Sequence, residues 1–307
     1  MSGEDSKSSG EIGETMAHQL LQSMGWGSLP KGIKVQCVYP KEHDQRSHGE
    51  DRVFVYNSPF QEDTTEVVHI SVKHNKDGYP EKRDPFKRIL KEHLEQLATI
   101  VQCGQFDQTV SAFIKAVGPR QRIRHLGLLI WLHSNPETID VDRRLDASQM
   151  QIPSGLKDFP ALLIDSGRAS FIHTVLSHFQ ATGLGAPTFY YPRLGSMPSA
   201  NPLRYGDILP IELVVSDIIP ISVLGKDRQR LYLYLREKFS QSALRKAYSL
   251  ARSFGDAWVE DNDIHIGFSD YVEGTHNNDK EIGLSAFGKS ASSVTIFSYK
   301  PNLLNLS

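Results

Sequence analysis

The chain has few cysteines: Cys37 and Cys103 are the only two in 307 residues, and no Cys-x-x-Cys pair is present. Two thiols cannot cross-link a fold of this size, so a disulfide-built secreted scaffold is excluded. The spacing of cysteine and histidine along the sequence also indicates no metal cluster of these residue types. We therefore expect a protein of a reducing, cytoplasmic setting.

Long apolar runs are also missing. The longest block, LGLLIWL, has the length of a strand, whereas a membrane-spanning helix needs about 20 apolar residues. The first residues, MSGEDSKSSGE, contain no apolar segment of the kind that a signal peptide needs. The net charge of -2 gives no global basic signature, so any binding of nucleic acid must depend on local patches.

What the sequence does contain is ordinary for a packed globular protein. Hydrophobic residues make up 39% and charged residues 23% of the chain, which is long enough for one large domain or two smaller ones. Alternation and helical spacing predict a mixed α/β fold. In chain order we expect a helix at 10–25, strands at 32–38, 52–56 and 66–75, helices at 85–103 and 106–117, and a strand at 124–133.

The rest of the chain also has mixed periodicities. They predict strands at 160–165, 213–223, 230–235, 263–268 and 293–299, and helices at 169–179 and 240–252. The Gly- and Pro-rich segment 183–205 is the best candidate for a linker. Residues 1–9 are rich in Ser, Gly and charge and are expected to form a disordered leader.

The stretch EVVHISVKHN at 66–75 carries the first candidate site. Apolar and polar residues alternate in it, which predicts a half-buried strand whose polar row ends in Ser71 and Lys73. Such a strand can present a site on its open face. The alternative is an edge strand protected by a solvated lysine.

Two carboxylates accompany this lysine. Glu14 lies one turn into the first helix, and Asp51 stands at the head of the strand at 52–56. Two carboxylates and Lys73 on neighbouring elements suit a hard cation such as Mg²⁺, which polarises a phosphodiester and helps to generate hydroxide. The lysine can position the attacking water and offset developing negative charge.

The ordered motifs resemble a known family. The helix fits Gly-x-x-x-Glu-x-x-Ala-x-x-Leu-Leu-x-x-x-Gly-Trp from Gly10 to Trp26, followed by Asp51 before a strand and Lys73 at the end of the next. This order is similar to that of the PD-(D/E)XK restriction-endonuclease-like nucleases, in particular the branch with Mrr-type enzymes and nucleases of bacterial anti-phage defence. The family core of helix, three strands, helix and strand matches the elements expected through about residue 133.

The resemblance implies a fold and an activity. It implies a restriction-endonuclease-like core at 10–135, followed by an α/β extension at 136–307 that serves for oligomerisation or partner binding. The activity implied is metal-dependent cleavage of DNA, with Asp51 and Glu14 as ligands of Mg²⁺ or Mn²⁺ and Lys73 as the catalytic lysine. The protein is then expected to act as a homo-oligomer or with a co-encoded defence subunit.

One position departs from the family pattern. The family has Glu, Asp or Gln two residues before the lysine, and this chain has Ser71. A hydroxyl is a weaker metal ligand than a carboxylate, which leaves open a degenerate subunit that binds DNA or a partner protein without cleavage. An RNA-directed nuclease is a third alternative, although no aromatic motif of RNA-binding domains supports it.

Basic residues provide candidates for contact with nucleic acid. Lys76 and Lys87 belong to a cluster after the key strand, and Arg120 and Arg122 to a run without an intervening acid. Contact with phosphates is one interpretation, and a solvated face is the other.

Three further titratable residues lie close to the candidate site in the sequence. Glu50 is expected to be a solvated charge, and His48 a turn residue, with support of the metal site as the alternative. His69 is expected either to contact phosphate or to form a structural hydrogen bond.

Overall fold

The computed structural model describes residues 3–27, 29–135, 141, 153–192, 203–224, 229–254, 263–288, 291 and 294–300. The chain divides into two compact units, 1–169 and 170–307. The first unit contains α1 (Gly3–Ser23), β1 (Lys31–Gln36), α2 (Pro40–His43), β2 (Ser47–Asn57), β3 (Thr64–Asn75), α3 (Arg83–Gly104), α4 (Gln108–Ala116), β4 (Arg122–His133), a 3-10 turn (Ser154–Leu156) and β5 (Ala161–Asp165).

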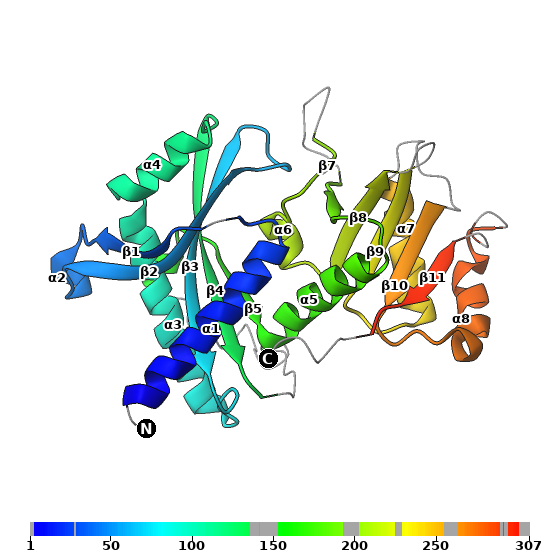
Figure 1. Ribbon diagram of the computed structural model, residues 1–307, viewed down its shortest axis with the longest axis horizontal. Coiled ribbons are helices and arrows are strands. Elements are labelled where there is room, and N and C mark those ends of the chain that lie inside the picture. The colour runs from blue at the N-terminus through cyan, green and yellow to red at the C-terminus, as the bar shows by residue number, and fades with distance from the viewer. Residues whose placement is uncertain are drawn as a thin grey trace. The chain divides into compact units, whose positions relative to one another are not determined.

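The first unit is built on one five-stranded sheet in the order β1-β2-β3-β4-β5 (Figure 1). The strands β1, β2 and β3 are antiparallel, and β3, β4 and β5 are parallel. The helix α3 provides much of the connection from β3 to β4, as a parallel pair requires. The α/β fold with a restriction-endonuclease-like core, predicted from the sequence, is confirmed.

The strand β3 is the central strand of this sheet, so the edge-strand interpretation is wrong. Its first eight residues are all buried, which also corrects the prediction of a half-buried strand. The two faces are covered by different helices: Gly13 of α1 packs on His74, and Gly104 of α3 packs on His69. Because residues 69 and 74 point to opposite faces, α1 and α3 lie on opposite sides of the sheet.

The long helix α3 buries the apolar stripe that its sequence predicts. Its leucines pack on two residues of β4, Leu129 and Trp131. Each fully buried side chain of this kind contributes about 1.5–3 kcal/mol relative to an exposed one. The close approach is possible because β4 has Gly127 opposite Leu97, where a Cβ atom would lie 2.8 Å from the leucine side chain. This packing fixes which face of α3 is directed toward β3.

Several boundaries differ from the expected ones. The helix α1 begins at Gly3, so most of the segment expected to be a disordered leader is helical. The strand β2 begins at Ser47, which places Asp51 inside the strand rather than at its head. The strand β5 pairs with β4 and extends the first unit to residue 169, beyond the expected boundary at 135.

The second unit has a six-stranded sheet in the order β11-β10-β9-β8-β6-β7. Its elements are β6 (Thr188–Tyr190), β7 (Tyr205–Gly206), α6 (Ile211–Val214), β8 (Ile218–Leu224), β9 (Gln229–Leu235), α7 (Gln241–Phe254), β10 (Ile264–Phe268), α8 (Glu273–Ser285) and β11 (Thr295–Ser298), with α5 (Ser166–Ala181) crossing the boundary between the units. The core lies between α7 and α8 and the parallel strands β9, β10 and β11.

Two predictions for this unit are wrong in part. The strand expected at 213–223 begins as the short helix α6 and becomes β8 only at Ile218. The linker expected at 183–205 contributes β6 to the second sheet, and its residues 193–202 lie outside the described part of the chain. Among the described residues, no helix is long and apolar enough to cross a membrane.

Candidate active site

The first unit has a cavity of about 360 Å³ where β2 and β3 separate beneath α3. Its lining comes from the loop and helix before β2, from the two strands, and from one face of α3. The lining residues are His43, Gln45, His48, Gly49, Asp51, Ser71, Lys73, Glu95, Gln96, Thr99 and Ile100. Three of the four predicted catalytic residues, Asp51, Ser71 and Lys73, are therefore brought together.

Asp51 is held in place by the end of β3. The pairing of β2 with β3 stops at Arg52 opposite Ile70, and the Oδ2 atom of Asp51 then accepts a hydrogen bond of 2.6 Å from the backbone N–H of Val72. A carboxylate thus replaces the carbonyl that a continuing strand would offer. The other carboxylate oxygen takes no hydrogen bond from the described residues, so it remains available to a ligand in the cavity.

Lys73 and Ser71 face the same cavity from β3. Lys73 is half-buried and, among the described residues, forms no ion pair with a carboxylate. Its charge acts on a neighbour on α3: burial, and then the charge of Lys73, lowers the pKa of His93 to about 4. The histidine is therefore neutral near pH 7, and Lys73 provides positive charge at the end of β3.

A carboxylate that the sequence interpretation missed completes the cavity. Glu95 of α3 lines it together with Thr99, one helical turn later. The sequence signal for Glu95 was its spacing: Glu95 and Thr99 are four residues apart and lie next to the buried Leu94 and Leu97. A helix packed on a sheet usually keeps the face toward the sheet apolar, so polar residues beside it indicate a site. Glu95 also forms an ion pair of 3.6 Å with Lys91 on the exposed side of the helix.

Glu14 does not line the cavity. It is exposed on α1, next to Gly13, which packs on His74. Since His74 and Lys73 are successive residues of a strand, they point to opposite faces of the sheet. The structure therefore does not bring Glu14 together with Asp51 as the sequence predicted.

The residues in the cavity fit a hard divalent cation. Asp51 and Glu95 offer carboxylate oxygens, and Ser71 offers a hydroxyl. Mg²⁺ and Mn²⁺ prefer such oxygen ligands and usually retain several waters, for which a cavity of this volume has room.

A buried polar network lies behind this site. Glu50 Oε1 is 2.6 Å from His69 Nδ1, and His69 Nε2 is 2.9 Å from His125 Nδ1. Glu50 is only 1% exposed, so the prediction of a solvated charge is wrong, whereas the prediction of a hydrogen-bonded His69 is confirmed. The network links β2, β3 and β4 just before β3 reaches Ser71.

Burial sets the protonation of this network. It raises the pKa of Glu50 well above its usual range, and the nearby carboxylates of Asp107 and Asp51 add to the shift. Burial lowers the pKa of His69 to about 4 and that of His125 to about 3. Both imidazoles are therefore neutral near pH 7.

The predicted nucleic-acid contacts divide into two groups. Lys76 is exposed just after β3, and Lys87 lies in the second turn of α3, both toward the end of β3 that carries Lys73. Arg122 pairs with Thr64 at the opposite end of β3, about 30 Å from Lys73 at strand spacing. Arg120 donates hydrogen bonds to the carbonyls of Ser58 and Gln61, which is a structural role.

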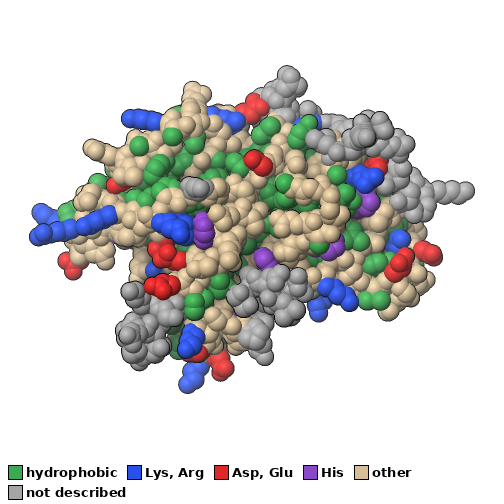
Figure 2. All heavy atoms as spheres, in the orientation of Figure 1, with side chains coloured by type: hydrophobic (Ala, Val, Ile, Leu, Met, Phe, Trp, Pro, Cys, Tyr) green, Lys and Arg blue, Asp and Glu red, His purple; other side chains and the backbone are tan. Residues whose placement is uncertain are grey.

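Three further basic residues lie on the β1–β2 hairpin, and two of them, Lys41 and Arg46, are close in sequence to the cavity residues His43 and Gln45. Lys34, Lys41 and Arg46 are exposed on β1, on α2 and just before β2. Figure 2 shows Lys and Arg side chains projecting at the left of the view, over the region where Figure 1 draws these elements. These residues provide local positive charge on a chain whose net charge is slightly negative.

Comparison with known proteins identifies the family of the first unit. The family model described as the GAPS4 protein PD-(D/E)XK nuclease domain matches residues 1–168, which is more than half of the chain and nearly all of the first unit. The comparison with curated proteins gave no match, and the comparison with solved structures gave none. With Asp51 and Lys73 in one cavity of the matched region, this chain belongs to the GAPS4 PD-(D/E)XK nuclease domain family, a family of anti-phage defence proteins.

Proposed function

We propose that this chain is a metal-dependent nuclease that hydrolyses phosphodiester bonds of DNA during anti-phage defence in the cytoplasm. The observation that carries the proposal is the cavity that gathers Asp51, Ser71 and Lys73 with Glu95. The family supports a nuclease, and the oxygen ligands with a nearby lysine support metal-dependent hydrolysis.

Each side chain has a role in this proposal. Asp51 and Glu95 bind Mg²⁺ or Mn²⁺, and the Ser71 hydroxyl contributes a weaker ligand. The bound ion supplies Lewis-acid polarisation of the phosphoryl oxygen and lowers the pKa of a water ligand. Lys73 orients the attacking water and neutralises charge that develops on the phosphate. Glu14 is left out because it does not line the cavity.

Basic residues around the cavity supply the affinity for DNA. We assign phosphate contacts to Lys76 and Lys87, and to the exposed Lys41 and Arg46. Lys34 is left out because it alternates with the buried Ile33 and Val35, which pack on the α3 side of the sheet. Arg120 and Arg122 are not part of this surface because they lie at the other end of β3. The second unit is available for the homo-oligomer or for a co-encoded defence subunit.

A degenerate subunit is the alternative function. Ser71 favours it, because this position holds an acid or an amide in the family pattern. The two functions differ in metal dependence: a nuclease is stabilised by Mn²⁺ through Asp51 and Glu95, and a degenerate subunit is not.

The test is cleavage of linear and circular duplex DNA with Mg²⁺ or Mn²⁺, with single strands and RNA as competing substrates. We expect Lys73→Met and Glu95→Gln each to lower the rate by at least about 100-fold. Glu92→Gln is the matched control, since Glu92 lies on the exposed side of α3, pairs with Arg88 and does not line the cavity. Equal cleavage by wild type and both site variants rejects the assignment.

If the wild-type protein cuts none of these substrates, cleavage is measured again in the presence of any co-encoded neighbour. The melting temperature of the wild type is also compared with and without Mn²⁺. If cleavage is still absent and Mn²⁺ has no effect on the melting temperature, the degenerate-subunit function replaces the proposal.

A rescue experiment tests the role of Glu95 separately. If Glu95 supplies the acid that position 71 lacks, Ser71→Glu should restore part of the activity lost in Glu95→Gln. The side chain at 71 faces the same cavity, so the new carboxylate enters it from β3. An unchanged rate in Glu95→Gln alone assigns the metal to Asp51 without Glu95. A lowered rate that Ser71→Glu does not restore rejects the idea that Glu95 replaces the acid at position 71.

A further inference from the structure

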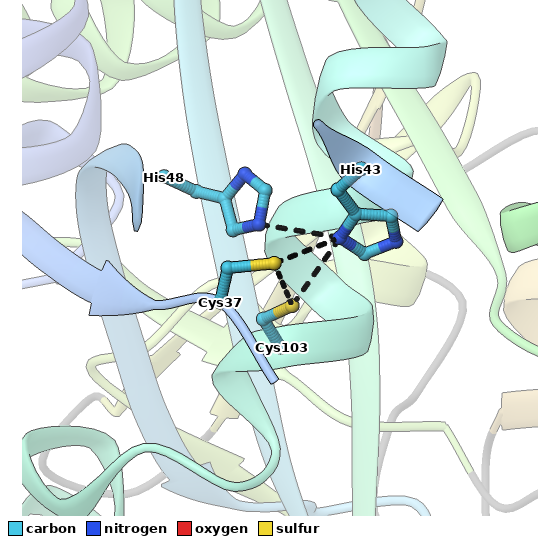
Figure 3. A group of neighbouring side chains, drawn as sticks. All are labelled: Cys37, His43, His48 and Cys103. Carbon is cyan, nitrogen blue, oxygen red and sulfur yellow. Dashed lines mark hydrogen bonds between the residues drawn. The ribbon is translucent and has the colours of Figure 1, made fainter. Parts of the chain in front are cut away.

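Four side chains from separate parts of the first unit converge beside the cavity. They are Cys37 just after β1, His43 at the end of α2, His48 in β2 and Cys103 near the end of α3. Figure 3 shows the two sulfur atoms and the two imidazoles directed toward one another. The sequence analysis expected no metal cluster of cysteine and histidine, because Cys103 is 55 or more residues from the other three, and the structure corrects this expectation.

The spacing of these atoms matches a tetrahedral metal site. The two Sγ atoms are 3.8 Å apart, His43 Nδ1 is 3.3 Å from Cys37 Sγ and 3.6 Å from Cys103 Sγ, and the two histidine nitrogens are 3.3 Å apart. Zinc bonds of about 2.3 Å to sulfur and about 2.0–2.1 Å to nitrogen give tetrahedral edges of about 3.8, 3.6 and 3.4 Å. All four ligand atoms lie within 4.8 Å of one another.

Hydrogen bonding supports the same conclusion. His43 Nε2 is 3.1 Å from Gln102 Oε1, and since the amide oxygen only accepts, Nε2 carries the ring hydrogen. The lone pair of Nδ1 then points toward two sulfur atoms and a second imidazole nitrogen. One lone pair cannot serve three donors, whereas one central cation serves all four ligand atoms. Gln102 fixes the ring as metal-bound histidines require.

We propose that Cys37, His43, His48 and Cys103 bind one structural Zn²⁺. Two thiolates and two imidazoles select zinc over the hard cations that suit Asp51 and Glu95. Four protein ligands leave no open position, so the ion has a structural role rather than a catalytic one.

The site has a clear structural consequence. It joins α2 and the β1–β2 hairpin to α3. The apolar cluster at this place contains residues of β1 and β2 with Cys103 of α3, and it contains no residue of α2. His48 is three residues before Asp51, where β2 leaves β3. The ion would therefore hold this part of β2 against α3, and the proposal does not depend on nuclease activity.

The test begins with the metal content of the full chain, purified under reducing conditions without a metal-affinity column. We expect about one zinc per chain by elemental analysis, released by a thiol-modifying reagent and detected with a colorimetric zinc indicator. The double variant Cys37→Ser/Cys103→Ser should hold none. His173→Ala is the matched control, since this half-buried histidine lies in the second unit, and it should keep the zinc.

Two measurements on wild type keep the test independent of whether the variants fold. Replacement of zinc by Co²⁺ should give a thiolate-to-metal charge-transfer band and the visible bands of a tetrahedral ion. Removal of zinc with a chelator should lower the melting temperature by roughly 5 °C or more, and Zn²⁺ but not Mg²⁺ should restore it.

The proposal is overturned if wild type holds no stoichiometric zinc after one equivalent is added under reducing conditions. It is equally overturned if the folded double variant retains its zinc, or if mass spectrometry finds Cys37 and Cys103 joined in a disulfide under those conditions. Failure of nuclease activity leaves the zinc measurements unchanged, so the two proposals are separable.

Discussion

Substitution of Asp51 separates a structural role from a catalytic one. Its Oδ2 atom accepts a hydrogen bond of 2.6 Å from the N–H of Val72, and its other oxygen is available in the cavity. Asn preserves an acceptor of the same shape and removes the charge, whereas Ala removes both. Asp51→Asn and Asp51→Ala should therefore differ in stability and agree in activity.

The magnitudes follow from this contact. A hydrogen bond to a charged group contributes about 1.5–3 kcal/mol, and in Asp51→Ala the half-buried N–H of Val72 loses its acceptor. We expect Asp51→Ala to lower the melting temperature by roughly 3–10 °C. Asp51→Asn should cost less than about 1 kcal/mol, because only the charge assistance is lost. Both should reduce DNA cleavage by at least about 100-fold, because an amide is a poor ligand for Mg²⁺.

The assay combines thermal denaturation with cleavage of duplex DNA at saturating Mg²⁺. Asp77→Asn is the control, since Asp77 is exposed in the turn after β3 and does not line the cavity. If Asp51→Asn cuts DNA at the wild-type rate, Asp51 is not a metal ligand and the proposed site is wrong. If Asp51→Ala is as stable as Asp51→Asn, the hydrogen bond to Val72 does not hold the strand end.

Two further predictions concern the network behind the site. Gly104→Ala should destabilise the protein by about 1–3 kcal/mol in thermal or urea denaturation although alanine has the better helix propensity, because the new Cβ would lie 2.4 Å from the Cε1 atom of the fixed His69 ring. Gly10→Ala in α1 is the control: its Cβ would meet nothing within 4 Å, and it should stabilise the protein by about 0.5–1 kcal/mol. A Gly104→Ala variant that is more stable than wild type contradicts the packing of α3 on His69. The contribution of His69 and His125 to stability should be complete above pH 6.5 and fall toward pH 4. The pKa values of these histidines are lowered to about 4 and about 3, so the unfolded chain binds more protons in that window. The lowered pKa of His69 corresponds to about 3 kcal/mol of unfolding free energy. The raised pKa of Glu50 acts in the opposite sense, because it makes the folded protein more stable as pH falls. Glu50→Gln should therefore steepen the loss of stability measured by denaturation between pH 7 and pH 4.5.

Much of the first unit could be predicted from the sequence because its elements have strong local signals. The alternation at 66–75 predicted β3, and the leucine spacing in 85–103 predicted α3. Burial of β3 on both faces was not predictable, because His69 and Ser71 look like surface residues. The hydrogen bond with Glu50 makes the burial of His69 acceptable. A polar residue without its partners carries no local sign of burial.

The parts that were missed depend on contacts between distant segments. Glu95 reaches the cavity only because α3 crosses β3, and Cys103 meets His43 only because the same helix passes the β1–β2 hairpin. The pattern of an isolated helix does not reveal which strand its polar residues face. The two-residue strand β7 is too short for any periodicity to indicate it.

Electrostatics explain why position 71 holds a serine instead of the acid of the family pattern. They favour a site in which an acid on α3 takes its place over a site that has lost nuclease function. Glu50 and Asp51 already lie on this part of the sheet, and the charge of Asp51 contributes to the raised pKa of Glu50. Ser71 is 2% exposed, so a carboxylate there would be poorly solvated and would lie at short range from the charge of Asp51. On α3, Glu95 is half-exposed and pairs with Lys91, so its charge is solvated while it still faces the cavity. In the proposed metal site, a carboxylate on the helix therefore provides an oxygen ligand at a lower cost in stability than a carboxylate on the strand.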